Sequence, residues 1–378
     1  MPVTLPPEVI VNILNSITDR RTLCSCALTC RLWLPASRYN LFYRLSISRR
    51  ANFDLLVRVR EAAHIAPAFK NVRSLQLWED QERPWLHLFP LIFSRRLPRM
   101  HFLTLGDFVW DKVPLPQSFY TIGHDFPSVS TLKLSDGTFH SFAEFRRLVS
   151  AFRQLSRLLV DNVQWRVSPS YYHCDFQPTL PRLELLWFRA NATCTVAVPT
   201  LVDWLMHTPS VESLNDLQLW EQNGSDLTHI QRLTQALGSR LVHFQVSLRF
   251  WTRDHRLSLS SNSSLRDLHI RDIDAASCGF LLPLLDTLSA GNLVQLVLYL
   301  RIPTLADLNV LGTIWPEVSN ILSLDDFHPL QTLTIWLLKV PPADTLPLQD
   351  LMRKLRSWMP VQDSRSVLRI MPWMFLED

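Results

Sequence analysis

Three of the six cysteines in this 378-residue chain crowd its first thirty residues, at Cys24, Cys26 and Cys30. On a helix, Cys26 and Cys30 share one face and Cys24 lies away from it. No histidine or acidic residue at ligand spacing completes the four positions of a structural zinc ion, and no pair has the CxxC spacing. We therefore interpret the cysteines as small reduced thiols and expect no metal site.

A second run with catalytic residue types is His173-Cys174-Asp175, in a loop rich in Ser, Pro and Tyr. A catalytic dyad is an arrangement in space, so adjacent letters of these types carry little weight. The sequence has no nucleophile elbow, no phosphate-binding glycine loop and no His-Glu-x-x-His pair. We expect a chain without catalytic activity and without a cofactor.

Charge and hydropathy restrict the partners. The net charge is +4, and the densest basic run, Arg95 to Arg99, is short. Binding to nucleic acid or to an acidic membrane surface needs a denser patch. The apolar stretches fall far short of the roughly 20 residues that cross a bilayer, and Met1 to Glu8 does not resemble a secretory signal. We expect a cytoplasmic or nuclear protein that binds neither nucleic acid nor membrane.

The first 45 residues carry the periodicity of three short helices. Pro6 and Pro7 fit a first helical turn, and Asp19 is a plausible N-cap for a second helix. A third helix is expected from about Trp33 towards Tyr39. The apolar positions at helical spacing are Val9, Ile10, Ile13, Leu14 and Ile17 in the first helix, and Leu23, Cys26, Ala27 and Cys30 in the second. So small a bundle needs a partner or a neighbouring domain for stability.

These residues resemble the F-box family. The run Leu5-Pro6-Pro7-Glu8 is followed by Ile13-Leu14 and then by Ala27-Leu28-Thr29-Cys30-Arg31-Leu32-Trp33, which are the family's landmarks in order and at the expected spacing. The resemblance covers only about the first 45 residues. It implies docking to a Skp-type adaptor, and through it to a cullin and a RING-type subunit.

The same resemblance implies which side chains contact the adaptor. By motif position they are Leu5, Pro6, Ile10, Ile13, Leu14, Leu28, Cys30 and Trp33. The alternative is that the apolar members only hold the helices together. Leu5 and Pro6 lie outside the helical stripe and favour contact, whereas Leu23 and Ala27 favour core packing.

An apolar-x-x-apolar-x-apolar pattern recurs along the remaining chain, residues 46–378. Copies start at 72, 100, 129, 155, 180, 214, 241, 265, 293 and 330, with a degenerate one at 367, so they are spaced by 24 to 37 residues. Leu75 to Glu79 and Leu217 to Glu221 are identical over five residues. Such spacing indicates an irregular repeat of one strand and one connecting segment.

Helical patterns lie between the strands. They include Phe142 to Phe152 behind Ser141, Leu227 to Leu237, Leu281 to Leu288 and Leu348 to Trp358. The chain here resembles leucine-rich repeats, although Asp80, Asp107, Asp136, Asn162 and Asp272 stand at or near the usual Asn or Cys position. Proteins that join an F-box to irregular repeats of this kind are common in fungi. The expected fold is α/β: a three-helix F-box at 1–45, then a leucine-rich-repeat-like solenoid at 46–378 with a curved parallel sheet.

The outward positions of the repeat strands are candidates for target binding. Alternate residues of a strand point to opposite faces, so the residues between the leucines face away from the helices. The candidates are Trp78, Trp220, Trp336, Gln76, Gln218, His269, Arg271 and Tyr299. The three tryptophans share one register, and exposed tryptophans often anchor a partner. The alternative is that each ring packs on a neighbouring strand.

The function implied by these resemblances is that of a substrate-recognition subunit of a Skp–cullin–F-box ubiquitin ligase. It would bind the adaptor through the F-box and an unknown target protein through the repeats. One alternative is an F-box scaffold that works outside ubiquitination, and another is an enzyme hidden in an unusual repeat array. The latter would need a cleft with converging titratable groups.

Overall fold

The computed structural model describes residues 5–62, 65–110, 119, 121–167, 181–190, 197–221, 227–249, 251, 257–288, 290–339 and 346–372. The run His173-Cys174-Asp175 lies outside the described residues. The chain divides into two compact units, Met1–Pro181 and Arg182–Asp378, and each is described by itself.

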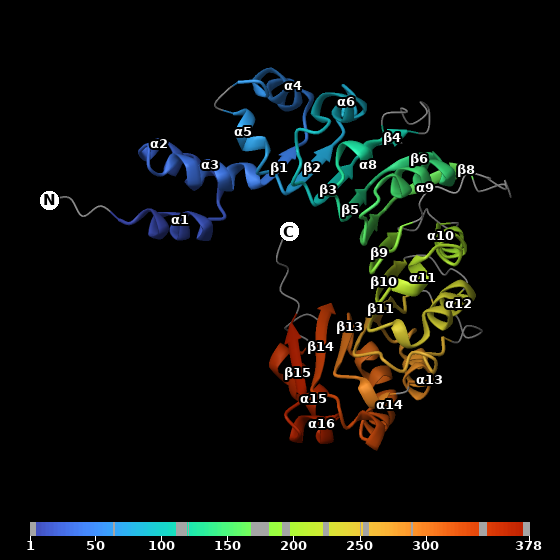
Figure 1. Cartoon of the computed structure of the whole chain (residues 1–378). Helices are drawn as coiled ribbons and strands as arrows, with labels where there is room; N and C mark the ends of the chain where they lie inside the picture. The colour runs from blue at the N-terminus through green and yellow to red at the C-terminus, as the bar shows by residue number, and fades with distance from the viewer. Residues whose placement is uncertain are drawn as a thin grey trace. The chain divides into compact units, whose positions relative to one another are not determined.

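Unit 1 begins with three short helices, α1 (Pro7–Ser16), α2 (Arg20–Thr29) and α3 (Leu34–Tyr43), as the periodicity predicts (Figure 1). Pro7 stands in the first turn of α1, where its missing N–H costs no hydrogen bond. Asp19 caps α2, since its carboxylate accepts a hydrogen bond from the Thr22 N–H at 2.7 Å. The predicted N-cap is thereby confirmed.

The core of these three helices is small. It consists of Ile10, Leu14, Leu23 and Cys26, with Ile17, Trp33, Ala36 and Leu41 packed around it. The predicted stripe in α2 holds for Leu23 and Cys26 but fails at Cys30, which is exposed. Cys30 follows the last turn of α2 in an extended conformation, so its side chain leaves the helical face.

Helix α3 passes directly into the first strand of the unit, β1 (Arg44–Ile47), which the sequence patterns missed. Strand β1 pairs in parallel with β2 (Ser74–Trp78), and Leu45 and Ile47 lie opposite Leu75 and Leu77. Phe42 of α3 also packs edge-on against Phe69, with ring centroids 5.8 Å apart. The helical module therefore continues into the repeats without a linker.

The sheet of unit 1 continues from β2 through β3 (Phe102–Gly106) and β5 (Thr131–Ser135) to β7 (Arg157–Asp161), all parallel. The connecting helices are α4 (Arg50–Val59), α5 (Ala66–Phe69), α6 (Phe89–Phe93), α8 (Ile122–Asp125) and α9 (Phe142–Ala151). A second small parallel sheet, also missed from the sequence, contains β4 (Val109–Trp110), β6 (Thr138–Ser141) and β8 (Gln164–Val167).

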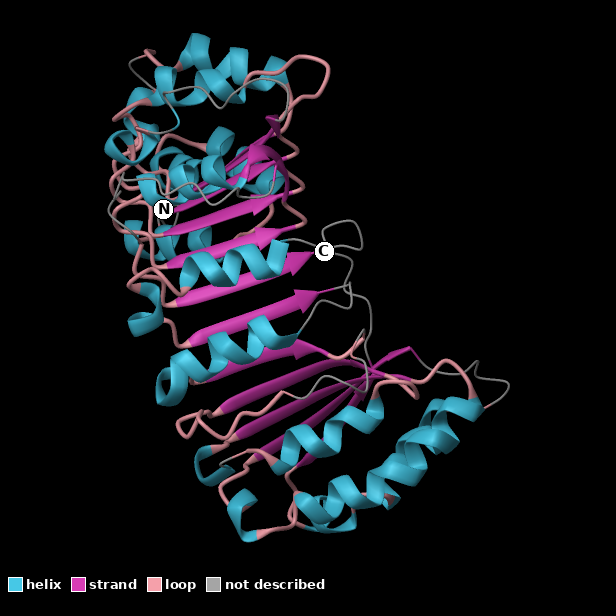
Figure 2. Cartoon of the chain, turned by 90° about the vertical axis from the view of Figure 1, so that its right-hand side faces the viewer, coloured by secondary structure: helices cyan, strands magenta, loops and turns pink. Residues whose placement is uncertain are grey.

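Unit 2 repeats the same plan. Its strands run in parallel in chain order (Figure 2): β9 (Leu185–Ala190), β10 (Asp216–Glu221), β11 (His243–Ser247), β12 (Asp267–Ile273), β13 (Gln295–Arg301), β14 (Thr332–Lys339) and β15 (Leu368–Pro372). The helices are α10 (Ala197–Leu205), α11 (Ser210–Ser213), α12 (Leu227–Leu237), α13 (Leu281–Asp286), α14 (Leu305–Ile321), α15 (Leu348–Ser357) and α16 (Pro360–Ser364). Strand then helix, as expected, is the repeating element.

Three details differ from the sequence expectations. The predicted copy at 180–185 is displaced, because the buried triplet is Leu183, Leu186 and Phe188 and the strand begins at Leu185. The 17-residue helix α14 was missed, and it contains Pro316 in its interior. Leu348 of α15 is exposed, while Leu351 and Leu355 carry the buried face.

Four acidic or amide residues of the strands have a left-handed backbone. Asp107, Asp136 and Asn162 directly follow β3, β5 and β7, whereas Asp272 lies inside β12, where its register shifts. All four have φ between 49° and 55°, in the region that Asn and Asp tolerate best after glycine. The Asn162 amide also donates to the Asp136 carboxylate at 2.6 Å. Partial burial and the nearby Asp136 raise the pKa of Asp107. Asp107, Asp136 and Asn162 thus end their strands, and Asp272 interrupts the register of β12, by adopting a conformation that most side chains avoid.

Trp78, at the end of β2, lies against the neighbouring strand at Gly106. A Cβ built on Gly106 would overlap the indole of Trp78. The two residues are register partners in the β2–β3 pair. Glycine is therefore required at this position for a steric reason, while the indole keeps part of its surface exposed.

We predict that Gly106→Ala lowers the free energy of unfolding by about 1–3 kcal/mol, because the added methyl group displaces the indole of Trp78. Chemical denaturation of the full chain measures the change. Gly291→Ala is the matched control, since a Cβ there meets nothing within 4 Å. In the double variant with Trp78→Ala, the loss of stability caused by Gly106→Ala should largely disappear. If the two substitutions instead lower the free energy of unfolding additively, the steric account is contradicted.

Candidate functional site

Among the described residues, the three N-terminal helices and their junctions expose more large apolar side chains than they bury in their core. Leu28 is 88% exposed and Leu5 is 44% exposed. Other large apolar side chains exposed on the same helices and their junctions are Val9, Val11, Ile13, Leu32, Tyr39 and Tyr43. Isolated exposed apolar residues are common, but a concentration on so few residues is typical of surfaces that bind a partner.

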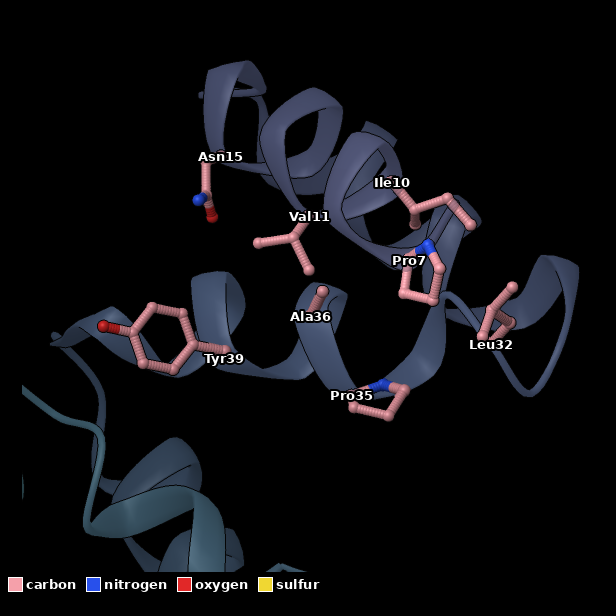
Figure 3. A pocket seen from close by; sticks show the side chains of 8 residues that line it. All are labelled: Pro7, Ile10, Val11, Asn15, Leu32, Pro35, Ala36 and Tyr39. Atoms are coloured by element: carbon pink, nitrogen blue, oxygen red, sulfur yellow. The ribbon is translucent and has the colours of Figure 1, made fainter. Parts of the chain in front are cut away.

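Part of this surface is a groove of about 500 Å³ between α1 and α3. Figure 3 shows side chains from both helices facing the groove, with Val11 from α1 opposite Tyr39 from α3. The lining residues are Pro7, Ile10, Val11, Asn15, Leu32, Pro35, Ala36 and Tyr39. Asn15 is the one amide among them, and Asn40 donates a hydrogen bond to its side-chain oxygen at 3.0 Å. The groove is therefore shaped for apolar side chains.

The residues predicted to contact an adaptor fall into two groups. Leu5, Pro6, Ile13, Leu28 and Cys30 are exposed, and Trp33 is half-buried against the helical core. Leu14 is fully buried in that core and offers no surface to a partner, which favours the alternative that it holds the helices together. Ile10 is also a core residue, although it reaches the groove wall.

Sequence reasoning missed Val11, Leu32 and Tyr39 as groove residues. A signal was present in α1, because Val9, Ile10, Val11, Ile13 and Leu14 are too many apolar residues for one stripe of a ten-residue helix. Only Ile10 and Leu14 of these are buried. An apolar surplus around a short surface helix predicts a second, intermolecular face.

The family model described as "F-box-like" matches residues 3–48, which include α1, α2 and α3. The chain carries an F-box-like domain. Its exposed apolar surface and groove thus lie within the matched residues, and β1 falls at their end.

Solved structures resemble the whole chain more loosely. The chain is similar to a protein in the "Crystal structure of Rad7 and Elc1 complex in yeast", with 12% sequence identity and a TM-score of 0.39. The alignment covers 94% of this chain and 93% of that one. No curated protein matches the sequence.

The second candidate surface is the strand face of unit 2, which we define as the outward-facing residues of β9 to β14. Helices α10 to α14 lie on the other side of these strands (Figure 1). Strand pairing places Gln218, Gln245 and His269 in one row across β10, β11 and β12. Closer to the carboxyl ends of the strands, a second row contains Trp220, Arg271 and Tyr299.

Trp220, Arg271 and Tyr299 form one stacked group, which we call the aromatic–arginine cluster. The guanidinium carbon of Arg271 lies 3.8 Å from the ring centroid of Trp220 and 4.1 Å from that of Tyr299. Trp220 reaches it from β10 and Tyr299 from β13, on either side of β12 in strand order. Each such contact is worth about 0.5–2 kcal/mol, so the cation is held in a fixed orientation. These three predicted residues are thereby brought together.

His269 belongs to the same surface but is uncharged at neutral pH. Its ring packs edge-on against that of His243, at 4.8 Å between centroids, and 6.3 Å from that of Tyr299. Burial, with His243 and Arg271 close by, lowers the pKa of His269 to about 4. At neutral pH, His269 therefore acts as a polar, neutral side chain.

The other predicted strand-face residues are more scattered. Gln76 is exposed and Trp78 half-buried, both in unit 1. In unit 2, Gln218 is half-buried beside Asp216, to whose carboxylate its amide donates at 3.0 Å. Trp336 is half-buried and is the register partner of Tyr299, so it borders the aromatic–arginine cluster.

In the described parts of the chain, no group of three or more His, Cys, Asp or Glu residues could hold a metal ion. No helix in the same segments has the length and apolar character to span a bilayer.

We predict that acidification destabilises the fold through His269. Between its folded pKa of about 4 and the ordinary value of 6.5, the unfolded chain binds more protons, so the free energy of unfolding rises with pH in this window. From pH 7 to pH 5 the loss from this group is about 2 kcal/mol. His269→Gln should remove that part of the pH dependence, as measured by urea denaturation at both pH values. His207→Gln, at an exposed histidine, should keep the wild-type pH dependence, and an unchanged loss in His269→Gln would refute the assignment.

Proposed function

We propose that this protein is a non-catalytic substrate receptor of a Skp–cullin–F-box ubiquitin ligase. Residues 1–45 would dock a Skp-type adaptor, and through it a cullin and a RING-type subunit. Residues 46–378 would bind a target protein on their strand faces. The chain would work in the cytoplasm or nucleus, where the exposed thiols of Cys24 and Cys30 stay reduced.

The observation that carries this proposal is the exposed apolar surface of the F-box-like domain. A helical module that buries four core side chains and exposes about twice as many large apolar ones gains stability when a partner covers them. The groove between α1 and α3 would accept apolar side chains of the adaptor. Leu5, Leu28, Leu32 and Tyr39 would surround that contact.

The rival proposal is an F-box scaffold that binds the adaptor but delivers no target for ubiquitination. Both proposals need the same apolar surface, so the geometry of the helices does not separate them. They differ in whether the ubiquitination of bound proteins depends on the F-box-like domain.

We predict that Leu28→Glu abolishes co-purification with a Skp-type adaptor and leaves the fold intact. Leu28 makes few contacts within the chain, whereas a carboxylate buried at an apolar interface costs about 2 kcal/mol or more. Leu5→Ala with Pro6→Ala should act in the same direction. Co-expression with the adaptor, followed by affinity capture and circular dichroism, measures both properties.

Leu91→Glu is the matched control, because Leu91 is a 66% exposed leucine on α6, outside the F-box-like domain. It should leave adaptor capture unchanged. Undiminished capture by the Leu28→Glu variant would remove the assigned docking surface. If capture is lost but no co-purifying protein loses ubiquitin, the scaffold proposal is favoured.

We predict that Trp220→Ala and Trp336→Ala reduce target binding, while adaptor binding persists. A tryptophan that anchors a partner costs about 2 kcal/mol or more on truncation. The measurement is quantitative mass spectrometry of the ubiquitinated proteins that co-purify with the full chain. The target proteins are defined as those whose ubiquitinated form is lost in the Leu28→Glu variant. Both tryptophan variants should lose the same target proteins. If both tryptophan variants retain these target proteins and have a native circular dichroism spectrum, the strand face of unit 2 is not the target site.

A further inference from the structure

The strand face of unit 2 is chemically asymmetric along its strands. Asp216 and Asp267 stand at the amino ends of β10 and β12. Towards the carboxyl ends, the outward positions are Arg189 in β9, Trp220 in β10 and Arg271 in β12. Among the described residues, carboxylates therefore stand at the amino ends of these strands, and arginines with an aromatic ring stand towards the carboxyl ends.

The aromatic–arginine cluster holds its cation in advance of any ligand. Burial lowers the pKa of Arg271, while Tyr299 and Asp272 favour the charged form. Asp272 is itself engaged by the Ser247 hydroxyl at 2.9 Å and by Arg301 at 3.5 Å. A guanidinium stacked against rings presents its N–H groups in its own plane, in the fork that matches a carboxylate. Little side-chain entropy remains to be lost when a carboxylate binds.

Two further donors, one in this cluster and one in the neighbouring row, have no acceptor. The Gln245 amide nitrogen lies on a side chain only 4% exposed, and it has no hydrogen-bond partner. The indole nitrogen of Trp220 is likewise buried without a partner. A buried donor left unpaired costs about 1–3 kcal/mol, so such groups call for an explanation. Both are donors, and an acceptor-rich ligand would satisfy them.

We propose that the strand face of unit 2 binds an acidic segment of a target protein, whose carboxylates are received by Arg271 and the neighbouring donors. One carboxylate contacts the guanidinium of Arg271 and the indole N–H of Trp220. A backbone carbonyl of the same segment accepts from Gln245. This inference rests on the proposed function, since it names the chemistry of the target that the receptor would bind.

The same face is poorly suited to phosphate groups and nucleic acid. Asp272 lies beside Arg271 and Arg301, and Asp216 and Asp267 stand at the amino ends of the same strands, so carboxylates oppose a doubly charged or continuous phosphate ligand. A singly charged carboxylate needs one well-oriented guanidinium, whereas a nucleic-acid backbone needs several cations along its path. The balance of charge therefore favours an acidic peptide.

The test is fluorescence anisotropy with the full chain and a short labelled peptide in which glutamate alternates with glycine. The matched probe has glutamine in place of each glutamate. We expect the glutamate peptide to bind at least about tenfold more tightly than the glutamine peptide, with affinity falling as salt rises. Equal binding of the two probes, or no binding of either, overturns the proposal.

Variants locate the site. Arg271→Gln should weaken binding by about tenfold, since it removes the charge, and Arg271→Lys should restore less than half of that loss because lysine lacks the planar fork. Trp220→Phe keeps a ring but removes the N–H, and should weaken binding about threefold. Arg353→Gln is the matched control, because it removes one positive charge from an exposed arginine on α15. A loss in Arg353→Gln equal to that in Arg271→Gln would show non-specific attraction and overturn the assignment.

Two competitors decide the ligand class. An unlabelled phosphoserine peptide or a single-stranded oligonucleotide that displaces the probe more strongly than the unlabelled glutamate peptide would overturn the acidic-peptide proposal. Adaptor capture by the same Arg271→Gln protein should be unchanged. If Arg271→Gln loses peptide binding but keeps adaptor capture, the effect is confined to the strand face of unit 2. If the wild-type protein fails to capture the adaptor, the proposed function itself is contradicted.

Discussion

The parallel pairing of strands through a shared apolar register is the constraint on which both units depend. In each pair, inward leucine-type residues lie opposite one another, as Leu75 and Leu77 do with Leu103 and Leu105. One strand and its helix cannot bury that apolar face alone, so every repeat is stabilised by its neighbours. The alternation of a strand then fixes the outward side chains as well. Trp220 and Arg271 are presented together because the inward leucines leave them no other face.

The F-box-like domain shows the opposite situation, a module too small to bury its own apolar residues. Its core contains Ile10, Leu14, Leu23 and Cys26, whereas Leu28 and Leu32 remain outside. The direct passage from α3 into β1 and the contact of Phe42 with Phe69 connect it to the repeats. The exposed leucines are not needed for that connection. Their retention on the surface is understandable when a partner covers them, because exposed apolar area otherwise favours aggregation.

Much of this architecture could be predicted from the sequence because its signals are local. The spacing of Leu214, Leu217 and Leu219 identifies a strand, and the faces of α9 and α12 follow from helical periodicity. Strand β1 was missed although Phe42, Leu45 and Ile47 have the repeat spacing, because this copy overlaps the end of α3 and its first residue belongs to the helix. Helix α14 was missed because Pro316 argues against a helix interior, a local preference that tertiary packing overrides. The register of β9 was misplaced because Leu180 offers a competing start for the pattern.

The candidate sites were less predictable, since they depend on contacts between distant residues. The outward register of Trp220, Arg271 and Tyr299 follows from strand alternation, but their stacking does not. It requires Trp220 to extend across β11, where Ser247 is small enough to leave room between β10 and β12. The two surfaces that result differ in physical character. The F-box-like domain offers apolar area, whose contribution to binding depends weakly on salt, whereas the strand face of unit 2 offers an oriented cation and unpaired donors, whose contribution depends on charge and geometry. Because the two surfaces use different forces and share no residue, one substitution can disable either of them and leave the other intact. For the proposed receptor, which would hold a constant adaptor and select a variable target, that separation is an advantage.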